Sequence, residues 1–278
     1  MEHVLSTHLF VNHRLTTALL DKIQAAGFQA VEIFCARQHL DYRNRAQITE
    51  LGHWFRDSGM ELRSLHAPMY TDEVWGRSGP NAVINITETV KPKRIQMVDE
   101  VKRALEIAEV IPFRYLIQHL GVSGEDYDER KVEAAFTSLE ELSLFARHRG
   151  VAILLENIPN ELSTAERLVH FLAQTHLDLG FCLDVGHANM REGVAEAFGL
   201  MQERIRSTHL HDNDRVSDSH LFPLIAGQGT VDWVETMRLL RSRPEQYPLL
   251  LELREVAGMA NPLEEVKRVF EELENLGT

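Results

Sequence analysis

Short apolar runs alternate along the chain with longer segments in which apolar residues recur at helical spacing. Apolar runs of about four to eight residues are typical of buried strands, whereas apolar positions three to four apart are typical of amphipathic helices. Strands are predicted at 4–10, 30–34, 60–66, 114–120, 151–157, 179–185, 205–212 and 247–255. Helices are predicted at 15–27, 46–59, 91–110, 128–149, 166–175, 194–205, 231–240 and 262–275. The pattern is therefore eight strands and eight helices in strict alternation.

This alternation predicts a parallel sheet, because each strand–helix–strand crossover returns the chain in the same direction. Eight units favour closure into a barrel over an open doubly wound sheet, and 278 residues suit one α/β barrel. No glycine-rich phosphate-binding motif follows the first strand, which disfavours a dinucleotide-binding fold. We therefore predict an α/β fold, a single (β/α)8 TIM barrel, with one domain over residues 1–278.

Metal-binding side chains recur close to the points where the predicted strands end. They are His66, His119, Glu156, Asp184, His187, His209, Asp218, His220 and Glu252. In a barrel of parallel strands, the carboxyl ends of the strands converge on one opening, where the active sites of this fold lie. Glu, Asp and His supply the mixed oxygen and nitrogen ligands that suit Mn²⁺, Co²⁺, Zn²⁺ or Mg²⁺. The sequence therefore predicts a divalent metal centre at this end of the barrel.

Some of these positions also have a structural interpretation. Asp184 could cap the helix that follows it, and Glu252 could form a buried ion pair with Arg254. Asp218 could belong to a turn, with His220 on the surface. These alternatives stay open, although a carboxylate that ends so apolar a strand is costly to bury without a cation.

Further residues near the strand ends are candidates for substrate contact: His8, Glu32, His211, Tyr70 and Trp75. His209 and His211 are two residues apart and point to the same side of a strand, so either could be the ligand and the other a supporting group. His8 and Glu32, from the first two predicted strands, could instead form hydrogen bonds only to backbone groups. Tyr70 and Trp75 lie in a long loop, 67–90, that could exclude water as a lid or simply pack onto the barrel.

Composition and charge narrow the class of protein. The formal net charge is −13 and 44% of residues are hydrophobic, which indicates a globular chain without the clustered basic surface that nucleic-acid binding needs. Two cysteines, Cys35 and Cys182, are too few for a disulfide framework and are expected as buried free thiols. No signal peptide or apolar stretch of about 18 residues is present, so we expect a cytoplasmic protein without a membrane span.

An ordered set of motifs carries a family resemblance. The set is HAP at 66–68, HLG at 119–121, LEN at 155–157, DVGHA at 184–188, HLHD at 209–212, DSH at 218–220 and LELR at 251–254. It resembles the xylose isomerase-like barrels, which include sugar isomerases, sugar epimerases and endonuclease IV. The resemblance covers essentially the whole chain. One departure is Gly227-Gln228-Gly229, where the family often has a glutamate between the glycines, and this puts the bonding of that loop in doubt.

Two ligand sets follow from the resemblance. Ketose 3-epimerases hold one Mn²⁺ or Co²⁺, which implies a set here of Glu156, Asp184, His209 and Glu252. Their substrate-binding histidine and arginine correspond to His187 and Arg215. Endonuclease IV holds three zinc ions with nine residues, and all nine positions are matched here, the set being completed by His66, His119, Asp218 and His220.

The resemblance implies a metal-dependent sugar or sugar phosphate isomerase or epimerase that works through an enediolate. Glu156 and Glu252 are its expected catalytic residues, with one divalent ion and at most three. The expected partner is a small sugar rather than nucleic acid, and a homo-oligomer is compatible with the sequence. The alternatives are an endonuclease IV-like, zinc-dependent phosphodiester hydrolase and a barrel that only binds a sugar.

Overall fold

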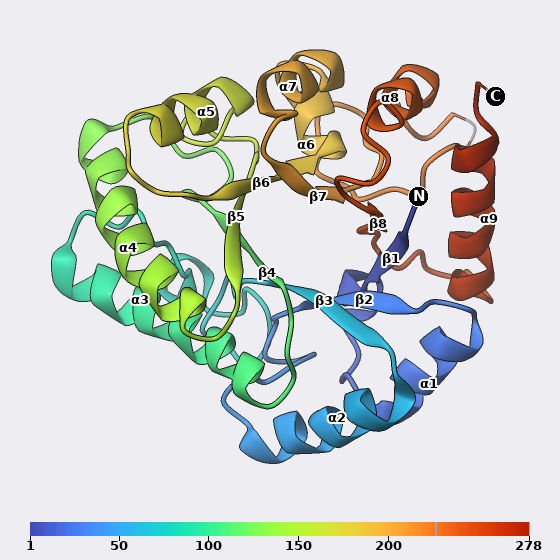
Figure 1. The fold of residues 1–278 in the computed structure, drawn as a ribbon, viewed down its shortest axis with the longest axis horizontal. Coiled ribbons are helices and arrows are strands. Elements are labelled where there is room, and N and C mark those ends of the chain that lie inside the picture. The colour runs from blue at the N-terminus through green and yellow to red at the C-terminus, as the bar shows by residue number, and fades with distance from the viewer. Residues whose placement is uncertain (226, 278) are drawn as a thin grey trace.

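Eight parallel strands form the centre of the protein in a computed structural model that describes residues 1–225 and 227–277 (Figure 1). The strands are β1 (His3–Ser6), β2 (Ala30–Phe34), β3 (Glu61–His66), β4 (Tyr115–His119), β5 (Ala152–Glu156), β6 (Gly180–Asp184), β7 (Ile205–His209) and β8 (Leu249–Leu251). They are hydrogen-bonded in the order β7-β6-β5-β4-β3-β2-β1-β8. All eight predicted strands are confirmed.

The seam between β7 and β8 completes the barrel just above the strand ends. Leu210 pairs in parallel with Leu251, its amide donates to the Leu250 carbonyl at 2.8 Å, and the Glu252 amide donates back to Leu210 at 3.2 Å. These bonds fix the backbone of Glu252 beside the end of β7. The predicted (β/α)8 barrel is therefore confirmed.

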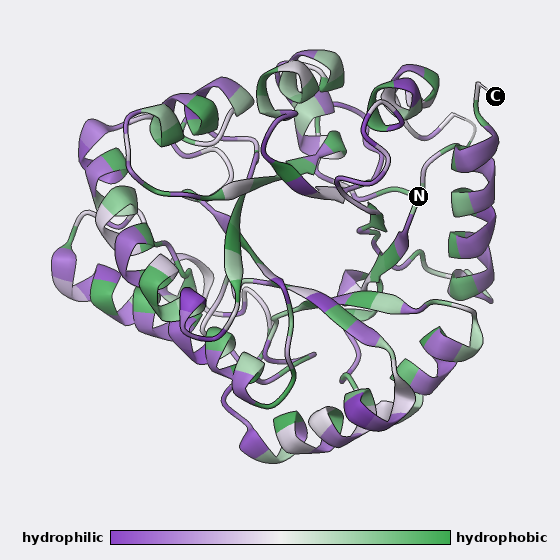
Figure 2. Cartoon of the chain, viewed as in Figure 1, coloured by the Kyte–Doolittle hydropathy of each residue, from purple (hydrophilic) through white to green (hydrophobic). Residues whose placement is uncertain are grey.

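Helices surround the strands on all sides of the view in Figure 1. Those between successive strands, or after the last, are α1 (Thr17–Ala25), α2 (Arg45–Ser58), α3 (Lys91–Leu105), α4 (Glu129–Arg147), α5 (Ala165–Ala173), α7 (Val194–Met201), α8 (Trp233–Leu240) and α9 (Pro262–Asn275). Their amphipathic sequences explain the arrangement, because apolar positions at helical spacing can all face the sheet. Figure 2 shows this alternation of hydrophobic and hydrophilic residues along the helices.

Several element bounds differ from the prediction; the strands predicted at 205–212 and 247–255, for example, end at His209 and Leu251. The first strand ends at Ser6, and Thr7–Phe10 form a 3-10 helix, so His8 lies on this turn and not at a strand end. The helix predicted to reach residue 110 ends as an α-helix at Leu105 and continues as a 3-10 turn, Glu106–Glu109. A short additional helix, α6 (Val185–Met190), follows β6 directly, so the alternation is not strict.

Apolar side chains fill both the inside of the barrel and the layer between strands and helices. Inside, Val4, Ala30 and Leu250 form one buried cluster, and Ile117, Leu154 and Cys182 form another. Cys35 and Cys182 are buried free thiols, as predicted. Burial raises the pKa of both thiols, which keeps them protonated. Within the described part of the chain, no helix has the length and apolar character needed to cross a membrane.

Candidate metal centre

The predicted metal-binding residues converge at one end of the barrel. Three groups bring their ligand atoms within 4.8 Å of one another: Glu156, Asp184, His209 and Glu252; His66, His119 and Glu156; and His187, His211, Asp218 and His220. All nine positions predicted from the sequence are included, together with His211. Because the groups share Glu156 or adjoin it, they form one continuous polar centre.

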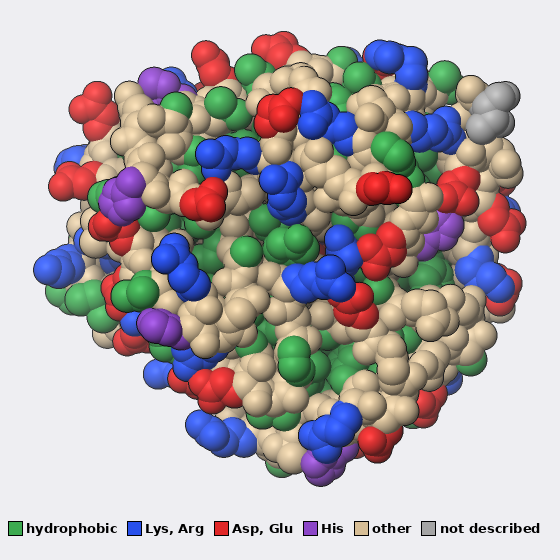
Figure 3. Space-filling model, in the orientation of Figure 1, with side chains coloured by type: hydrophobic (Ala, Val, Ile, Leu, Met, Phe, Trp, Pro, Cys, Tyr) green, Lys and Arg blue, Asp and Glu red, His purple; other side chains and the backbone are tan. Residues whose placement is uncertain are grey.

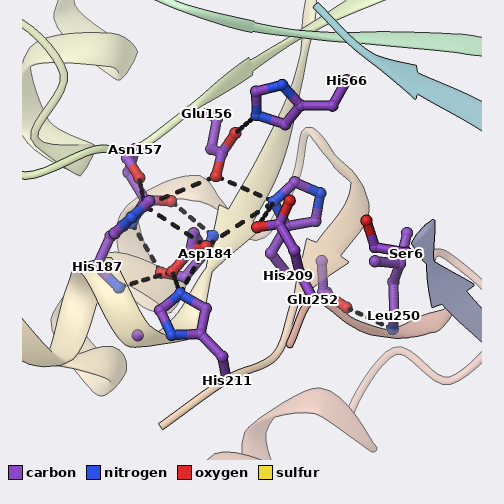
Figure 4. Close-up of polar contacts among 12 residues, drawn as sticks. Ser6, His66, Glu156, Asn157, Asp184, His187, His209, His211, Leu250 and Glu252 are labelled. Carbon is purple, nitrogen blue, oxygen red and sulfur yellow. Dashed lines mark hydrogen bonds and ion pairs between the residues drawn. The ribbon is translucent and has the colours of Figure 1, made fainter. Parts of the chain in front are cut away.

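The central group is Glu156, Asp184, His209 and Glu252, whose side chains point toward one another in Figure 4. His209 Nδ1 lies 3.0 Å from Glu156 Oε1, 3.3 Å from Glu252 Oε2 and 3.8 Å from Asp184 Oδ2. All four residues are buried. Four strands thus deliver three carboxylates and one imidazole to a single point, which is the ligand set of a divalent ion.

Asp184 is both a helix cap and a member of the central group, the two roles that the sequence left open. Its Oδ1 accepts a hydrogen bond from the His187 amide at 2.6 Å and so caps α6. Its Oδ2 faces His209 in the central group. The cap fixes the rotamer of the carboxylate and turns Oδ2 toward His211 and the central group.

One flanking group lies toward β3 and β4. His66 Nε2 is 3.2 Å from His119 Nε2, and His119 Nε2 is 2.9 Å from Glu156 Oε2. Glu156 therefore directs one oxygen to the central group and the other to this pair. The histidines are at the ends of their strands, as the apolar patterns of β3 and β4 predict.

The other flanking group is built from α6, the end of β7 and the loop that follows. His187 Nε2 lies 3.2 Å from Asp218 Oδ2, and His220 Nε2 lies 3.3 Å from Asp218 Oδ1. His211 Nε2 is 3.1 Å from Asp184 Oδ1 and its ring stacks on that of His220. Asp218 and His220 are thus drawn back over the opening and are not a surface turn.

The donor set fits a divalent cation better than a structural ion pair. Arg254 is exposed, and the ion pairs of Glu252 within the described residues are to His209 and His220. Glu252 Oε1 is buried and has no hydrogen-bond partner in the structure. Burying a carboxylate with an unpartnered oxygen is costly, and a cation bound beside the group lowers that cost.

The crowded carboxylates also change the protonation of the histidines. Burial alone would lower the pKa of His187, but the charges of Asp184, Asp218 and Glu156 outweigh it and raise the pKa to about 10. Burial likewise opposes protonation of His209, yet the carboxylates around it hold its pKa well above the usual value. Without metal, protons supply the positive charge that this part of the barrel requires.

Glu32 contacts the side chain of His209. Its Oε2 is 3.3 Å from His209 Nε2 and also accepts a hydrogen bond from the Ser64 hydroxyl at 2.7 Å. Both carboxylate and imidazole are fully buried. Since His209 turns Nδ1 to the central group, Glu32 is placed to hold the proton on Nε2 and fix the ring. The substrate contact expected of Glu32 from the sequence stays a prediction.

A glycine explains how His211 reaches the centre. A Cβ atom on Gly186 would lie 2.1 Å from Cε1 of the His211 ring, which no real side chain tolerates. The glycine in the DVGH motif therefore makes room for the second histidine of the HLHD motif.

Asp212 is a supporting residue that the sequence did not single out, although the HLHD motif contains it. Its Oδ1 accepts from the amides of Thr230 and Val231 at 2.9 and 3.0 Å, and the Trp233 indole donates to its Oδ2 at 2.7 Å. Asp212 thus connects the beginning of the loop after β7 to the residues at its end. The non-glycine residues with positive φ among the described residues all lie in this loop: Arg215, His220 and Leu224. Such conformations are costly and persist only where surrounding contacts hold them.

The remaining substrate-contact candidates lie around the opening. His8 is buried and its Nδ1 is 2.9 Å from the Leu253 carbonyl, while its ring contacts those of Trp75 and His220. Tyr70 packs edge-on against Trp75. Arg215 is exposed and its Nε donates to the Asn189 side chain at 3.2 Å. The structure therefore brings His8 and the aromatic pair to the centre but leaves Arg215 at its rim.

The fold and the site together define a TIM barrel with a cluster of candidate metal ligands at the carboxyl ends of its strands. A family model described as "Xylose isomerase-like TIM barrel" matches residues 20–276. The chain belongs to this family.

Relatives in the family differ in their described activities. An uncharacterised protein of Methanocaldococcus jannaschii is 26% identical over 98% of this chain and 90% of its own length. A D-psicose 3-epimerase of Enterocloster bolteae is 24% identical over 84% of this chain and 75% of that enzyme. A probable endonuclease 4 of Natronomonas pharaonis is 27% identical over 49% of this chain and 53% of its own length.

Solved structures share the whole barrel. A D-tagatose 3-epimerase-like protein superposes with a TM-score of 0.77 at 23% identity, covering 99% of this chain and 97% of that one. The IOLI protein with a bound zinc atom superposes with a TM-score of 0.75 at 17% identity, covering 98% of both chains. At these identities the likeness establishes the fold.

Replacing Glu32 with Gln should weaken binding of one divalent ion by about 10- to 100-fold, since supporting carboxylates of ligand histidines contribute this much. Competition with a chelator on the folded protein measures the change. Glu100→Gln is the control, because Glu100 is also buried but accepts its bonds from Tyr42 and Arg43, away from the centre. Wild-type affinity in Glu32→Gln would contradict the role assigned to this residue.

Metal binding should release protons at about pH 7.5, because ligand imidazoles must be neutral to bind. The imidazole of the central group is His209, whose pKa the surrounding carboxylates raise well above the usual value, so this ring favours its protonated form in the metal-free protein. Affinity for one ion should therefore rise with pH until the raised pKa of His209 is passed. Calorimetry in buffers of different ionisation enthalpy measures the protons released, and a binding heat that is independent of the buffer would refute this expectation.

Proposed function

We propose that this protein is a metal-dependent isomerase or epimerase of a small sugar. The observation that carries the proposal is the convergence of Glu156 and Glu252 on His209 Nδ1, from β5 and from the end of β8. Two carboxylates that both approach this point can exchange protons with a bound carbonyl compound. The exchange would take place at the two faces of one carbon in an epimerase, or at two neighbouring carbons in an isomerase. The described activity of the psicose epimerase relative supports this proposal.

A divalent ion would be held by Glu156, Asp184, His209 and Glu252, and Mn²⁺ and Co²⁺ suit these ligands. When bound, such an ion supplies Lewis-acid stabilisation of the negative charge that develops on a sugar oxygen. The chain fixes the geometry beforehand, because all four ligands stand on strand ends or on the helix cap.

The two glutamates are not equivalent. Both oxygens of Glu156 face histidines, with Oε1 toward His209 and Oε2 toward His119. Glu252 Oε1 has no partner, so this is the oxygen free to take the proton beside the carbonyl. Glu156 in its protonated form then returns a proton at the opposite face or the neighbouring carbon, and the proton taken by Glu252 passes to solvent or back to Glu156 before the next turnover.

Water must be kept from the reactive intermediate, and the 67–90 loop is placed for this. Trp75 packs against Phe34 and His8 beside the centre, and Tyr70 packs against Trp75. A dry, closed opening strengthens the electrostatic contacts inside it. We therefore assign this aromatic pair to the wall of the substrate site.

Glu252→Gln should lower exchange of substrate protons with solvent by about 10²- to 10⁴-fold, the usual contribution of a general base. Deuterium uptake into a ketose from heavy water measures it, at metal saturation confirmed by elemental analysis. Glu255→Gln is the matched control, since Glu255 is exposed and three residues away. Exchange at the wild-type rate in Glu252→Gln would remove Glu252 from the reaction.

A second candidate function is zinc-dependent phosphodiester hydrolysis. It is favoured by the two flanking groups, which with the central group offer ligands for up to three ions. The net charge of −13 opposes it, and on the face drawn in Figure 3 basic side chains are interspersed with acidic ones.

The two functions separate in the variant Asp218→Asn, which removes the carboxylate between His187 and His220. Isomerisation through the central group should survive this change within about tenfold, whereas hydrolysis through clustered ions should be abolished. Cleavage of an abasic-site duplex by the zinc-loaded wild type, lost in Asp218→Asn, would replace the first proposal by the second.

A further inference from the structure

Asn157 is the last residue of the LEN motif and follows Glu156 at the end of β5, where it is 2% exposed. The Asp184 amide donates to Asn157 Oδ1 at 2.8 Å, and Asn157 Nδ2 donates to the Asp184 carbonyl at 2.8 Å (Figure 4). One partner is a donor and the other an acceptor, so the two ends of the carboxamide are not interchangeable. The side chain therefore binds the backbone of Asp184 on both sides of its Cα atom.

These two bonds continue the sheet beyond the end of its main-chain pairing. The pairing of β5 with β6 runs from Leu154 opposite Gly180 to Glu156 opposite Cys182. Two residues further along β6, Asp184 is paired on its other side with His209 of β7. The Asn157 carboxamide offers Asp184 the same donor and acceptor as a peptide group. Asp184 is thus held between two strands although β5 has already ended.

The charges beside Asp184 are the reason why its backbone must be held. Asp184 and Glu156 belong to the central group, whose ligand atoms lie within 4.8 Å of one another. Two ionised carboxylates so close together repel each other until a cation is bound. The α6 cap holds the side chain of Asp184, and the Asn157 bonds hold its main chain to the strand that carries Glu156. The separation of the two carboxylates is therefore set by the protein itself.

The main-chain carbonyl of Asn157 orients a third residue of the centre. His187 Nδ1 lies 3.0 Å from this carbonyl oxygen, and His187 Nε2 lies 3.2 Å from Asp218 Oδ2. A carbonyl oxygen only accepts hydrogen bonds, so Nδ1 carries a proton. In the neutral ring, Nε2 is then the nitrogen that is left to accept a hydrogen bond or to bind an ion.

We propose that Asn157 is a positioning residue of the centre: its carboxamide sets the separation of the Glu156 and Asp184 carboxylates, and its carbonyl makes Nε2 the accepting nitrogen of His187. The inference rests on the proposed function for the reaction that this geometry serves. Both ends of the carboxamide are already bonded to Asp184, so Asn157 acts through that residue and not as a ligand.

The first test is the binding of one Co²⁺ ion to Asn157→Leu, in which the side chain has a similar size but no polar group. Competition with a chelator should show an affinity about 10- to 100-fold lower, the usual effect of losing a group that orients a metal ligand. The visible absorption bands of the bound Co²⁺ should also change in position or intensity, because they depend on the arrangement of the ligands. A wild-type spectrum in the variant would overturn the inference, whatever the affinity.

Gln47→Met is the matched control, because Gln47 is also a buried amide that bonds to backbone. Its Nε2 donates to the Leu15 and His39 carbonyls at 3.0 and 3.2 Å, and its Oε1 accepts from the Asp41 amide at 3.0 Å. None of these partners belongs to the three ligand groups. The control should therefore lower the unfolding temperature and leave the Co²⁺ spectrum unchanged.

Asn157→Ala is a second variant that is less exposed to misfolding. Its smaller side chain leaves room for water beside the two backbone groups of Asp184, which lowers the cost of losing the carboxamide. The same loss of affinity and the same change in the Co²⁺ spectrum are expected, and a wild-type spectrum would again overturn the inference.

The second test is proton exchange of a ketose at saturating metal. Both Asn157 variants should lower kcat by about 10- to 100-fold, because a displacement of about 1 Å at a reacting group costs this much. KM should change much less, since the carboxamide acts on the geometry of the centre and not on the substrate. An unchanged kcat would overturn the inference.

The tautomer of His187 tests the part assigned to the Asn157 carbonyl. Long-range ¹H–¹⁵N correlation spectra of the zinc-loaded protein report it, with the ring identified by the loss of its signals in His187→Gln. A proton on Nδ1 is expected, and a neutral ring with its proton on Nε2 would overturn this part of the inference.

Failure of the inference and failure of the proposed function give different results. A wild-type Co²⁺ spectrum and kcat in the Asn157 variants, with exchange by the wild type, would overturn the inference and leave the isomerase proposal standing. A changed Co²⁺ spectrum in Asn157→Leu, with no proton exchange by the wild type under any of the metals tested, would support the inference and overturn the proposed chemistry.

Discussion

The concentration of buried negative charge at the mouth of the barrel is the constraint on which the rest of the site depends. Glu32, Glu156, Asp184 and Glu252 are buried there, with Asp218 partly buried beside them, and their ion pairs within the described residues are to histidines. Carboxylates so close together cannot all stay ionised without compensating positive charge. A divalent ion meets this requirement and leaves the imidazoles neutral, as ligands must be.

The surrounding structure keeps these groups in place before any ion arrives. The cap of α6 fixes Asp184, Glu32 and Ser64 fix the ring of His209, and the seam between β7 and β8 fixes the backbone of Glu252. Asp212 closes the loop that carries Asp218 and His220. The supporting bonds come from residues distant in sequence, so the site is a product of the closed barrel and not of one motif.

Much of this could be predicted because it depends on local pattern. The apolar runs identify the eight strands, and polar residues at or just after their ends converge once the barrel closes, which is why the nine predicted positions lie in three adjoining groups. The role of Glu32 could not be read in the same way, because it depends on the ring orientation of His209 in another strand. The 3-10 turn at His8 and the helix after Asp184 likewise depend on three-dimensional packing.

The most direct test of the metal centre is an anomalous difference map from crystals of the protein purified without chelator and collected at the absorption edge of the metal found. The account predicts a peak at coordination distance, about 2.0–2.3 Å, from Glu156, Asp184, His209 and Glu252. A map without a peak among these four residues, in crystals grown with divalent metal, would contradict the central claim.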